Sequence, residues 1–146
     1  MDIDRTVQRL IRDYETSDPF RLARDKQIVV LYEDLGNYRG YYNKVYRHKF
    51  IHIHEDLDEV QKKITCAHEL GHSILHTNTS TPYMRSNTFY STNRYEREAN
   101  LFASHLLITD AFIQEHLDCY GELNIFRIAG DLMLPVELVK LKLNVL

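Results

Sequence analysis

The chain has 146 residues, of which 18 are basic and 21 are acidic, so its formal net charge is −3 with neutral histidine. Apolar residues make up 44 % and charged residues 27 % of the chain, which is typical of a globular domain and excludes a disordered or collagen-like protein. The weak negative charge argues against a polycationic nucleic-acid binder. We therefore expect one domain over residues 1–146.

The cysteines and the apolar segments indicate in which cellular compartment the protein is located. Cys66 and Cys119 are the two cysteines, and the charged N-terminal sequence lacks the apolar stretch of a secretory signal, which favours reduced thiols. No apolar run approaches the ~18 residues that span a bilayer. We expect a cytoplasmic protein with no membrane partner, and the sequence leaves the oligomeric state open.

Two short helices are predicted at the N-terminus. Apolar residues recur at helical spacing among charged ones from Ile3 to about Asp13. A second helix is predicted to begin with Asp18 as its N-cap and Pro19 in its first position, and to end near Asp25.

A small sheet is predicted next. β-branched and aromatic residues predict strands over residues 28–32 and about 39–42, joined as a hairpin through a Gly-Asn turn. A third strand, about residues 49–54, alternates strictly. Its isoleucines are expected to face the core, and His52 and His54 are expected to face solvent.

The rest of the chain is predicted to be helical apart from one long loop. Apolar spacing and capping residues predict helices over about residues 57–76, 94–107, 110–117, 123–132 and 135–143. The loop over residues 77–92 is long for a compact domain, which indicates a functional flap. Helices, a small sheet and further helices in this order indicate an α+β fold rather than a doubly wound parallel sheet.

Residues 68–72 read His-Glu-Leu-Gly-His, an HExxH sequence inside a predicted helix. Residues four apart lie on one helix face, so His68 and His72 can bind one Zn²⁺, while Glu69 lies beside the metal and can take a proton from the attacking water. Gly71 costs the helix about 1 kcal/mol relative to alanine, and a close approach of another part of the chain would explain it.

A catalytic zinc needs a third protein ligand. Glu96 and Glu98 are the candidates, and their positions do not decide between them, because each lies about equally far from the apolar stripe of the helix over residues 94–107. His76 lies one turn beyond His72 on the same face and is a candidate near-site residue.

The oxyanion formed during peptide hydrolysis needs a second stabilising group. Four residues are candidates that the sequence does not rank: Tyr83, Tyr90, Arg94 and His105. Of these, Tyr90 and His105 are also kept as near-site candidates in general.

Two separated motifs occur in the order seen in one known family. The block Ile64–His72 closes with His76, and the block Tyr95–Ala103 is followed by the pair Leu106–Leu107. Together they resemble the ImmA/IrrE family of bacterial and phage metallopeptidases. The resemblance is good over about residues 18–110, so we divide the domain into this core and a C-terminal helical subregion over residues 110–146.

The resemblance implies a small minimal-zincin fold of the gluzincin type, with a short antiparallel or mixed sheet, an active-site helix and C-terminal helices. It implies that the glutamate directly before an alanine, Glu98, is the third zinc ligand, with Glu96 as second choice. It also implies a zinc endopeptidase with Glu69 as general base. The expected substrate is a helix-turn-helix repressor of a phage or mobile element, cleaved at one site.

A peptide substrate needs an extended surface, and an edge strand supplies one by strand addition. The predicted strands at 49–54 and 39–42 are the candidates. The alternative function is a regulator that binds the repressor or DNA without cutting, with a structural metal. The two terminal helices could mimic a helix-turn-helix, but they contain only three basic residues and are too apolar for a groove-reading face, which disfavours a nucleic-acid partner.

Overall fold

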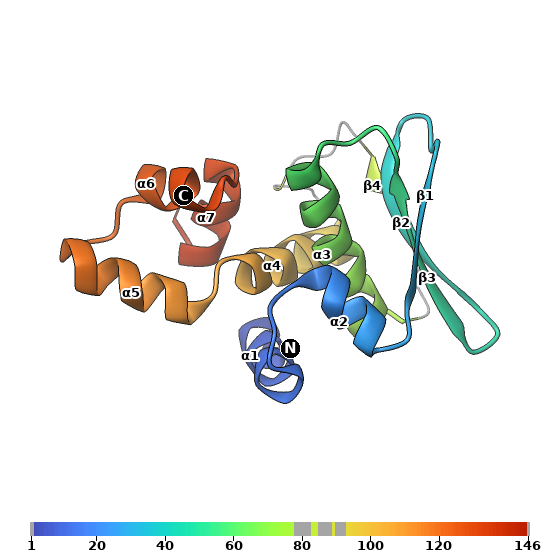
Figure 1. Ribbon diagram of the computed structural model, residues 1–146, viewed down its shortest axis with the longest axis horizontal. Helices are drawn as coiled ribbons and strands as arrows, with labels where there is room; N and C mark the ends of the chain where they lie inside the picture. Colours follow the sequence, from blue (N-terminus) through green and yellow to red (C-terminus); the bar gives the residue numbers. More distant parts are fainter. Residues whose placement is uncertain (1, 78–82, 85–88, 90–92, 146) are drawn as a thin grey trace.

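The computed structural model describes residues 2–77, 83–84, 89 and 93–145. In Figure 1 a small sheet lies at one side of the molecule, two long helices lie at its centre, and the C-terminal helices lie at the opposite end. The described elements, in chain order, are α1 (Ile3–Tyr14), α2 (Pro19–Asp25), β1 (Val29–Glu33), β2 (Tyr38–Val45), β3 (His48–His54), α3 (Glu59–Leu75), β4 (Tyr83–Met84), α4 (Arg94–Leu107), α5 (Asp110–Tyr120), α6 (Ile125–Leu132) and α7 (Val136–Leu143). The α+β expectation is confirmed.

The helices begin where local capping chemistry places them. From α1 to α6, each helix follows a residue whose side chain accepts a hydrogen bond from a first-turn N–H group, which satisfies one of the free donors there. Asp18 and Pro19 begin α2 as expected, and Asp58 begins α3. The predicted helices are confirmed to within a few residues at each end.

The predicted hairpin between the first two strands is wrong. The strand order is β1-β3-β2-β4, with β3 parallel to β1 and antiparallel to β2. The hairpin is formed instead by β2 and β3, through the two residues Tyr46 and Arg47, and Tyr46 has a φ of 57°. A turn signal between two strands shows that the chain bends there. It does not show whether the two strands pair with each other or with a third strand that lies between them.

The predicted exposure of His52 and His54 is also wrong. Their residues are only 8 % and 2 % exposed. The His52 ring stacks on Tyr41 with centroids 4.0 Å apart and contacts the Glu33 carboxylate, while His54 Nε2 lies 3.4 Å from Asp34 Oδ1. Side chains from the neighbouring strands and from the loop after β1 therefore cover this face at both histidines.

The substrate edge expected from the sequence lies inside the sheet. The strand at 49–54 is β3, which has β1 on one side and β2 on the other. The 39–42 stretch belongs to β2, and β4 pairs with it at Tyr38 and Gly40. Neither candidate is therefore a fully open edge for strand addition. The flap expected over residues 77–92 lies mostly outside the described residues.

The centre of the molecule is the packing of α3 against α4. The apolar stripe of α4 is buried as expected, and Phe102 is fully buried. A Cβ atom at Gly71 would lie 3.0 Å from Phe102 Cδ1, which confirms the expected close approach at this glycine. Gly71 therefore lets α4 come near enough for its side chains to reach those of α3.

The terminal helices form a second apolar cluster. Ile128 from α6 and Leu138 from α7 are fully buried there with Ile64 from α3 and Ile108. Lys142 of α7 is also buried and contacts Asp110 at the start of α5. No helix within the described ranges is both long and apolar enough to cross a membrane.

Two glycines provide a matched test of backbone packing. At Gly40, a Cβ would lie 2.4 Å from the backbone oxygen of His52 and 2.7 Å from Thr65 Cγ2, whereas at Gly130 in α6 nothing lies within 4 Å. We expect Gly40→Ala to lower the free energy of unfolding by about 1–3 kcal/mol through overpacking. We expect Gly130→Ala to raise it by about 1 kcal/mol through helix propensity. Urea unfolding measures both, and equal effects of the two substitutions would contradict this packing.

Candidate metal centre

Three side chains from α3 and α4 converge on one point. His68 and His72 extend from the same face of α3, with ring centroids 4.9 Å apart. The Glu96 carboxylate of α4 reaches both rings, because its oxygen atoms lie 3.2 Å from His68 Nε2 and 2.7 Å from His72 Nε2. One ligand atom from each of the three residues lies within 4.8 Å of the other two. All three residues are buried, so the cluster can enclose one cation.

The expected third ligand, Glu98, is not in this cluster. Its Oε1 atom lies 3.0 Å from His76 Nε2. Glu96 and Glu98 are about 200° apart around a helix axis, so only one of them can face the two histidines of α3. Packing turns Glu96 toward α3, where it is 2 % exposed. The geometry therefore favours Glu96, the residue kept as second choice, over Glu98 as the third ligand.

The electrostatics of the cluster suit a divalent cation. Burial alone would raise the pKa of Glu96, but its hydrogen bonds with His68 and His72 outweigh burial and lower that pKa to about 2. Burial lowers the pKa of His72, against the opposing hydrogen bond with Glu96. The lowered pKa of Glu96 favours its ionised carboxylate, and two histidines with one glutamate are a donor set found in catalytic zinc sites.

Glu69 is a second buried carboxyl group beside the cluster. It is fully buried, and within the described part of the chain neither of its carboxylate oxygens has a hydrogen-bond partner. Burial, and then the charge of Glu96, raise the pKa of Glu69 well above its ordinary value. A buried carboxyl group without a partner is costly unless a ligand compensates it, so this orphaned group supports the fit of a cation here.

The structure places one of the near-site candidates beside the cluster and another away from it. His76 lies in the site, because its Nδ1 atom is 3.0 Å from His72 Nδ1. His105 does not, because its ring contacts Lys142 and Asp4 where α1, α5 and α7 meet. Arg94 is exposed at the start of α4, and its Nε atom lies 3.7 Å from Glu98 Oε1.

The expectations for Tyr90 and for the side chain of Tyr83 fall outside the described residues. Of the four groups considered for the oxyanion, only Arg94 and His105 can therefore be placed. The structure removes His105 from the site, since its surroundings are those of a helix junction.

Sequence reasoning missed Asn100 as a site residue. Its Oδ1 atom lies 2.8 Å from His68 Nδ1, and the residue is 1 % exposed. The amide oxygen of Asn100 can accept only from a protonated Nδ1, so Nε2 is the nitrogen of His68 that can bind a cation. The available signal was its position four residues after Glu96, which puts both side chains on one face of α4.

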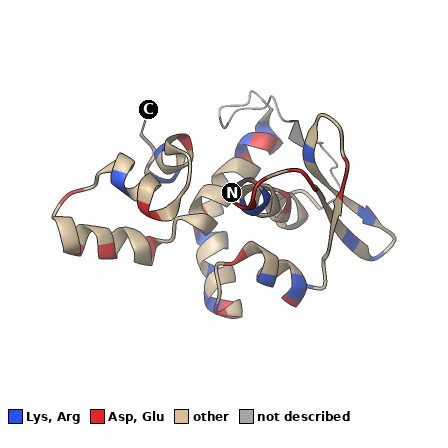
Figure 2. Ribbon diagram, turned by 45° about the horizontal axis from the view of Figure 1, so that its top comes forward, with Lys and Arg blue, Asp and Glu red and all other residues tan. Residues whose placement is uncertain are grey.

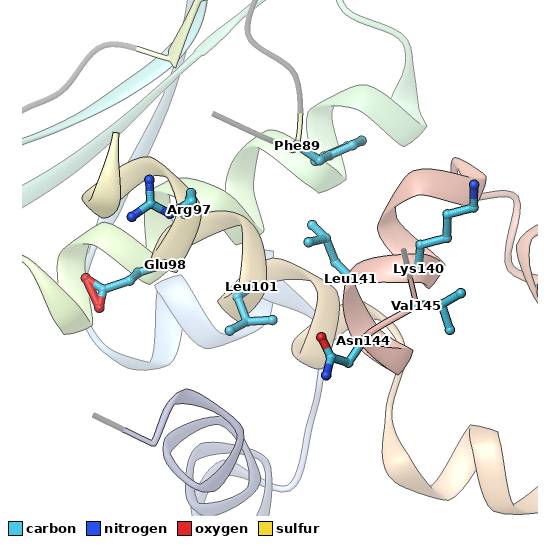
Figure 3. A pocket seen from close by; sticks show the side chains of 8 residues that line it. All are labelled: Phe89, Arg97, Glu98, Leu101, Lys140, Leu141, Asn144 and Val145. Carbon is cyan, nitrogen blue, oxygen red and sulfur yellow. The ribbon is translucent and has the colours of Figure 1, made fainter. Parts of the chain in front are cut away.

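An apolar pocket of about 560 Å³ lies between α4 and the C-terminal end of α7. Figure 3 shows Glu98 and Arg97 at one end of it and Val145 at the other, with Leu101 and Leu141 between them. Since Glu98 contacts His76, this pocket borders the outer side of the histidine cluster.

Two helices bring two histidines of an HExxH sequence to a buried glutamate, an arrangement typical of metal-dependent hydrolases. The comparison with protein families agrees with this class. Residues 23–144 match the Peptidase M78 family, described as the IrrE N-terminal-like domain. The chain belongs to this metallopeptidase family, so the resemblance seen in its motifs is confirmed.

Two curated relatives give the particular setting. The chain is 38 % identical over 141 residues to a protein of Bacillus phage phi105 named uncharacterized immunity region protein 2, an alignment that covers 96 % of the chain and 88 % of the relative. It is 31 % identical over 144 residues to the metallopeptidase ImmA of Bacillus subtilis strain 168, covering 97 % of the chain and 84 % of that relative.

Proposed function

We propose that this protein is a zinc-dependent endopeptidase that cuts one partner protein at a defined site, and that the partner is a helix-turn-helix repressor of a phage or mobile element. The observation that supports this most directly is the buried cluster of His68, His72 and Glu96 beside the unpaired carboxyl group of Glu69. The family membership and the names of both relatives support the immunity setting.

The proposed mechanism assigns one role to each residue. His68, His72 and Glu96 would hold the cation through two imidazole nitrogens and one carboxylate oxygen. When bound, the metal would polarise the scissile carbonyl and acidify the attacking water. Glu69 accepts a proton from that water and returns it to the leaving amine.

The pocket between α4 and α7 supports a protein substrate that is selected by docking. The pocket between α4 and α7 offers space for an apolar side chain close to the site. Val145, at the far end of this pocket, is 43 % exposed, so an incoming side chain can reach the pocket there.

The compartment fits such a substrate as well. Free, unpaired Cys66 and Cys119 are consistent with the cytoplasm, where such a repressor is located.

The rival function, binding to DNA through the terminal helices, has less support. Figure 2 shows acidic residues interspersed with the basic ones on α5 to α7, and a group of basic residues at the β2–β3 turn. Lys142 is withdrawn from any phosphate-binding face, because its side chain is 4 % exposed and pairs with Asp110. Too few basic side chains remain on α6 and α7 for a phosphate footprint.

Co-expression with a helix-turn-helix repressor from the same phage or mobile element tests the proposal. We expect one defined cut in the repressor, located by mass spectrometry, and no cut with Glu69→Gln. A repressor that stays intact with the wild-type protein under inducing conditions would count against proteolysis. Salt-dependent binding of the isolated protein to operator DNA would support the rival function instead.

A further inference from the structure

His72 is followed, on the side away from Glu96, by a buried histidine, His76, and a partly buried carboxylate, Glu98. His72 Nδ1 lies 3.0 Å from His76 Nδ1, and His76 Nε2 lies 3.0 Å from Glu98 Oε1. The side chain of His76 is 3 % exposed and that of Glu98 is 16 % exposed. The Tyr95 ring packs edge-on against His76 at 4.7 Å between centroids, so the orientation of His76 is fixed by its surroundings.

The positions of the protons in the row His72–His76–Glu98 follow from which of its atoms can donate and which can only accept. Two Nδ1 atoms face each other, so one of them must donate and the other must accept. The Glu98 carboxylate can only accept, so His76 Nε2 has a proton and donates to it. In neutral His76, Nδ1 is then the acceptor, and His72 Nδ1 is the donor. Nε2 of His72, which lies 2.7 Å from Glu96 Oε1, is then the nitrogen that can present its lone pair when a cation takes the place of this hydrogen bond.

We propose that Glu98 and His76 are positioning residues, which set the tautomer and orientation of His72 and so present its Nε2 atom to the metal. This inference rests on the proposed metal centre of His68, His72 and Glu96. Metal-binding histidines generally donate their second N–H to a carboxylate or carbonyl, and such partners raise the basicity of the ligand. Here the carboxylate acts on His72 through an intervening imidazole.

The two proposed histidine ligands are therefore supported in different ways. His68 donates directly to the neutral amide oxygen of Asn100, at 2.8 Å. His72 donates to a ring that is itself held by a carboxylate. Removing the Glu98 carboxylate should therefore weaken metal binding through His72 alone. It should do so only while residue 76 is a histidine, because only a histidine there needs a partner to fix its tautomer.

This dependence gives a double-mutant cycle with the whole protein. We expect Glu98→Ala and His76→Phe each to weaken zinc affinity by about 10–100-fold, the usual cost of losing a partner of a metal ligand. His76→Asn places an amide oxygen near the position of Nδ1, which can accept from His72 without Glu98. We expect that variant to bind zinc close to wild-type strength, and Glu98→Ala to have no further effect in its background.

The measurements are zinc affinity by competition with a chromophoric chelator and the visible absorption spectrum of the cobalt-substituted protein. Glu59→Ala is the matched control, because Glu59 lies in the first turn of α3 and its side chain is 94 % exposed and pairs with Lys62. We expect unchanged affinity and an unchanged cobalt spectrum for it. Thermal unfolding of the metal-free variants checks that they remain folded.

The outcomes separate this inference from the proposed centre. If Glu96→Gln binds zinc normally, the proposed centre itself is wrong. If Glu96→Gln loses zinc while His76→Phe and Glu98→Ala both bind it with wild-type affinity and spectrum, the centre stands and the positioning role is overturned. An equal loss of affinity on Glu98→Ala in the wild-type and His76→Asn backgrounds would also overturn it, because Glu98 would then act independently of His76.

Discussion

Glu69→Gln is expected to lower the rate of peptide cleavage by about 10²–10⁴-fold, the usual contribution of a general base. The two side chains have the same shape, but the amide cannot accept the proton from the attacking water. Glu69 is fully buried and its oxygen atoms form no hydrogen bond with the proposed ligands, so the substitution should leave the cluster in place. Cleavage of the purified repressor measures the rate, and zinc analysis of the same sample measures metal content.

A matched control lies on the same helix. Glu59, in the first turn of α3, has a side chain that is 94 % exposed and contacts Lys62. We expect Glu59→Gln to cleave at the wild-type rate. Wild-type activity in Glu69→Gln would show that another group accepts the proton, whereas loss of zinc from that variant would assign Glu69 to the metal rather than to proton transfer.

The second large effect is expected at Glu96. We expect Glu96→Gln to weaken zinc affinity by more than the about 10–100-fold that loss of a partner of a ligand costs, because it removes a charged ligand. The Glu96 carboxylate contacts both histidines, and its pKa of about 2 keeps it ionised throughout the useful pH range. Zinc content after dialysis, and the rise in melting temperature on adding zinc, measure the loss.

Comparison with Glu98 makes this prediction specific. Glu98→Gln keeps an oxygen that can accept from His76, so we expect a smaller loss of affinity than for Glu96→Gln. The reverse order, with zinc retained in Glu96→Gln and absent from Glu98→Gln, would restore Glu98 as the ligand that the resemblance implied.

Most helices were predictable because their signals are local. Asp18 with Pro19, and Thr109 before α5, act on the hydrogen bonds of their own first turn, so their effect does not depend on the rest of the fold. The predicted close approach at Gly71 is also confirmed. Glycine has a low helix propensity, so its presence inside a helix indicates a close neighbour, which is Phe102 here.

The sheet was predicted less well because strand pairing is not local. The strands themselves were found near their correct positions, but β3 pairs between β1 and β2, and this order has no signature in a turn. The burial of His52 followed from the same order, since Glu33 on β1 and Tyr41 on β2 become its neighbours only when β3 is central.

The sequence by itself determined the family, the helix that bears His68 and His72, and the place of Glu69 between them, because the spacing of residues within one helix fixes their angles about its axis. Only the tertiary structure decided that Glu96 faces the histidines, and that Glu98 contacts His76 instead. The rotation of α4 against α3 depends on buried contacts between residues far apart in the chain, such as Gly71 with Phe102, and no spacing within α4 encodes it.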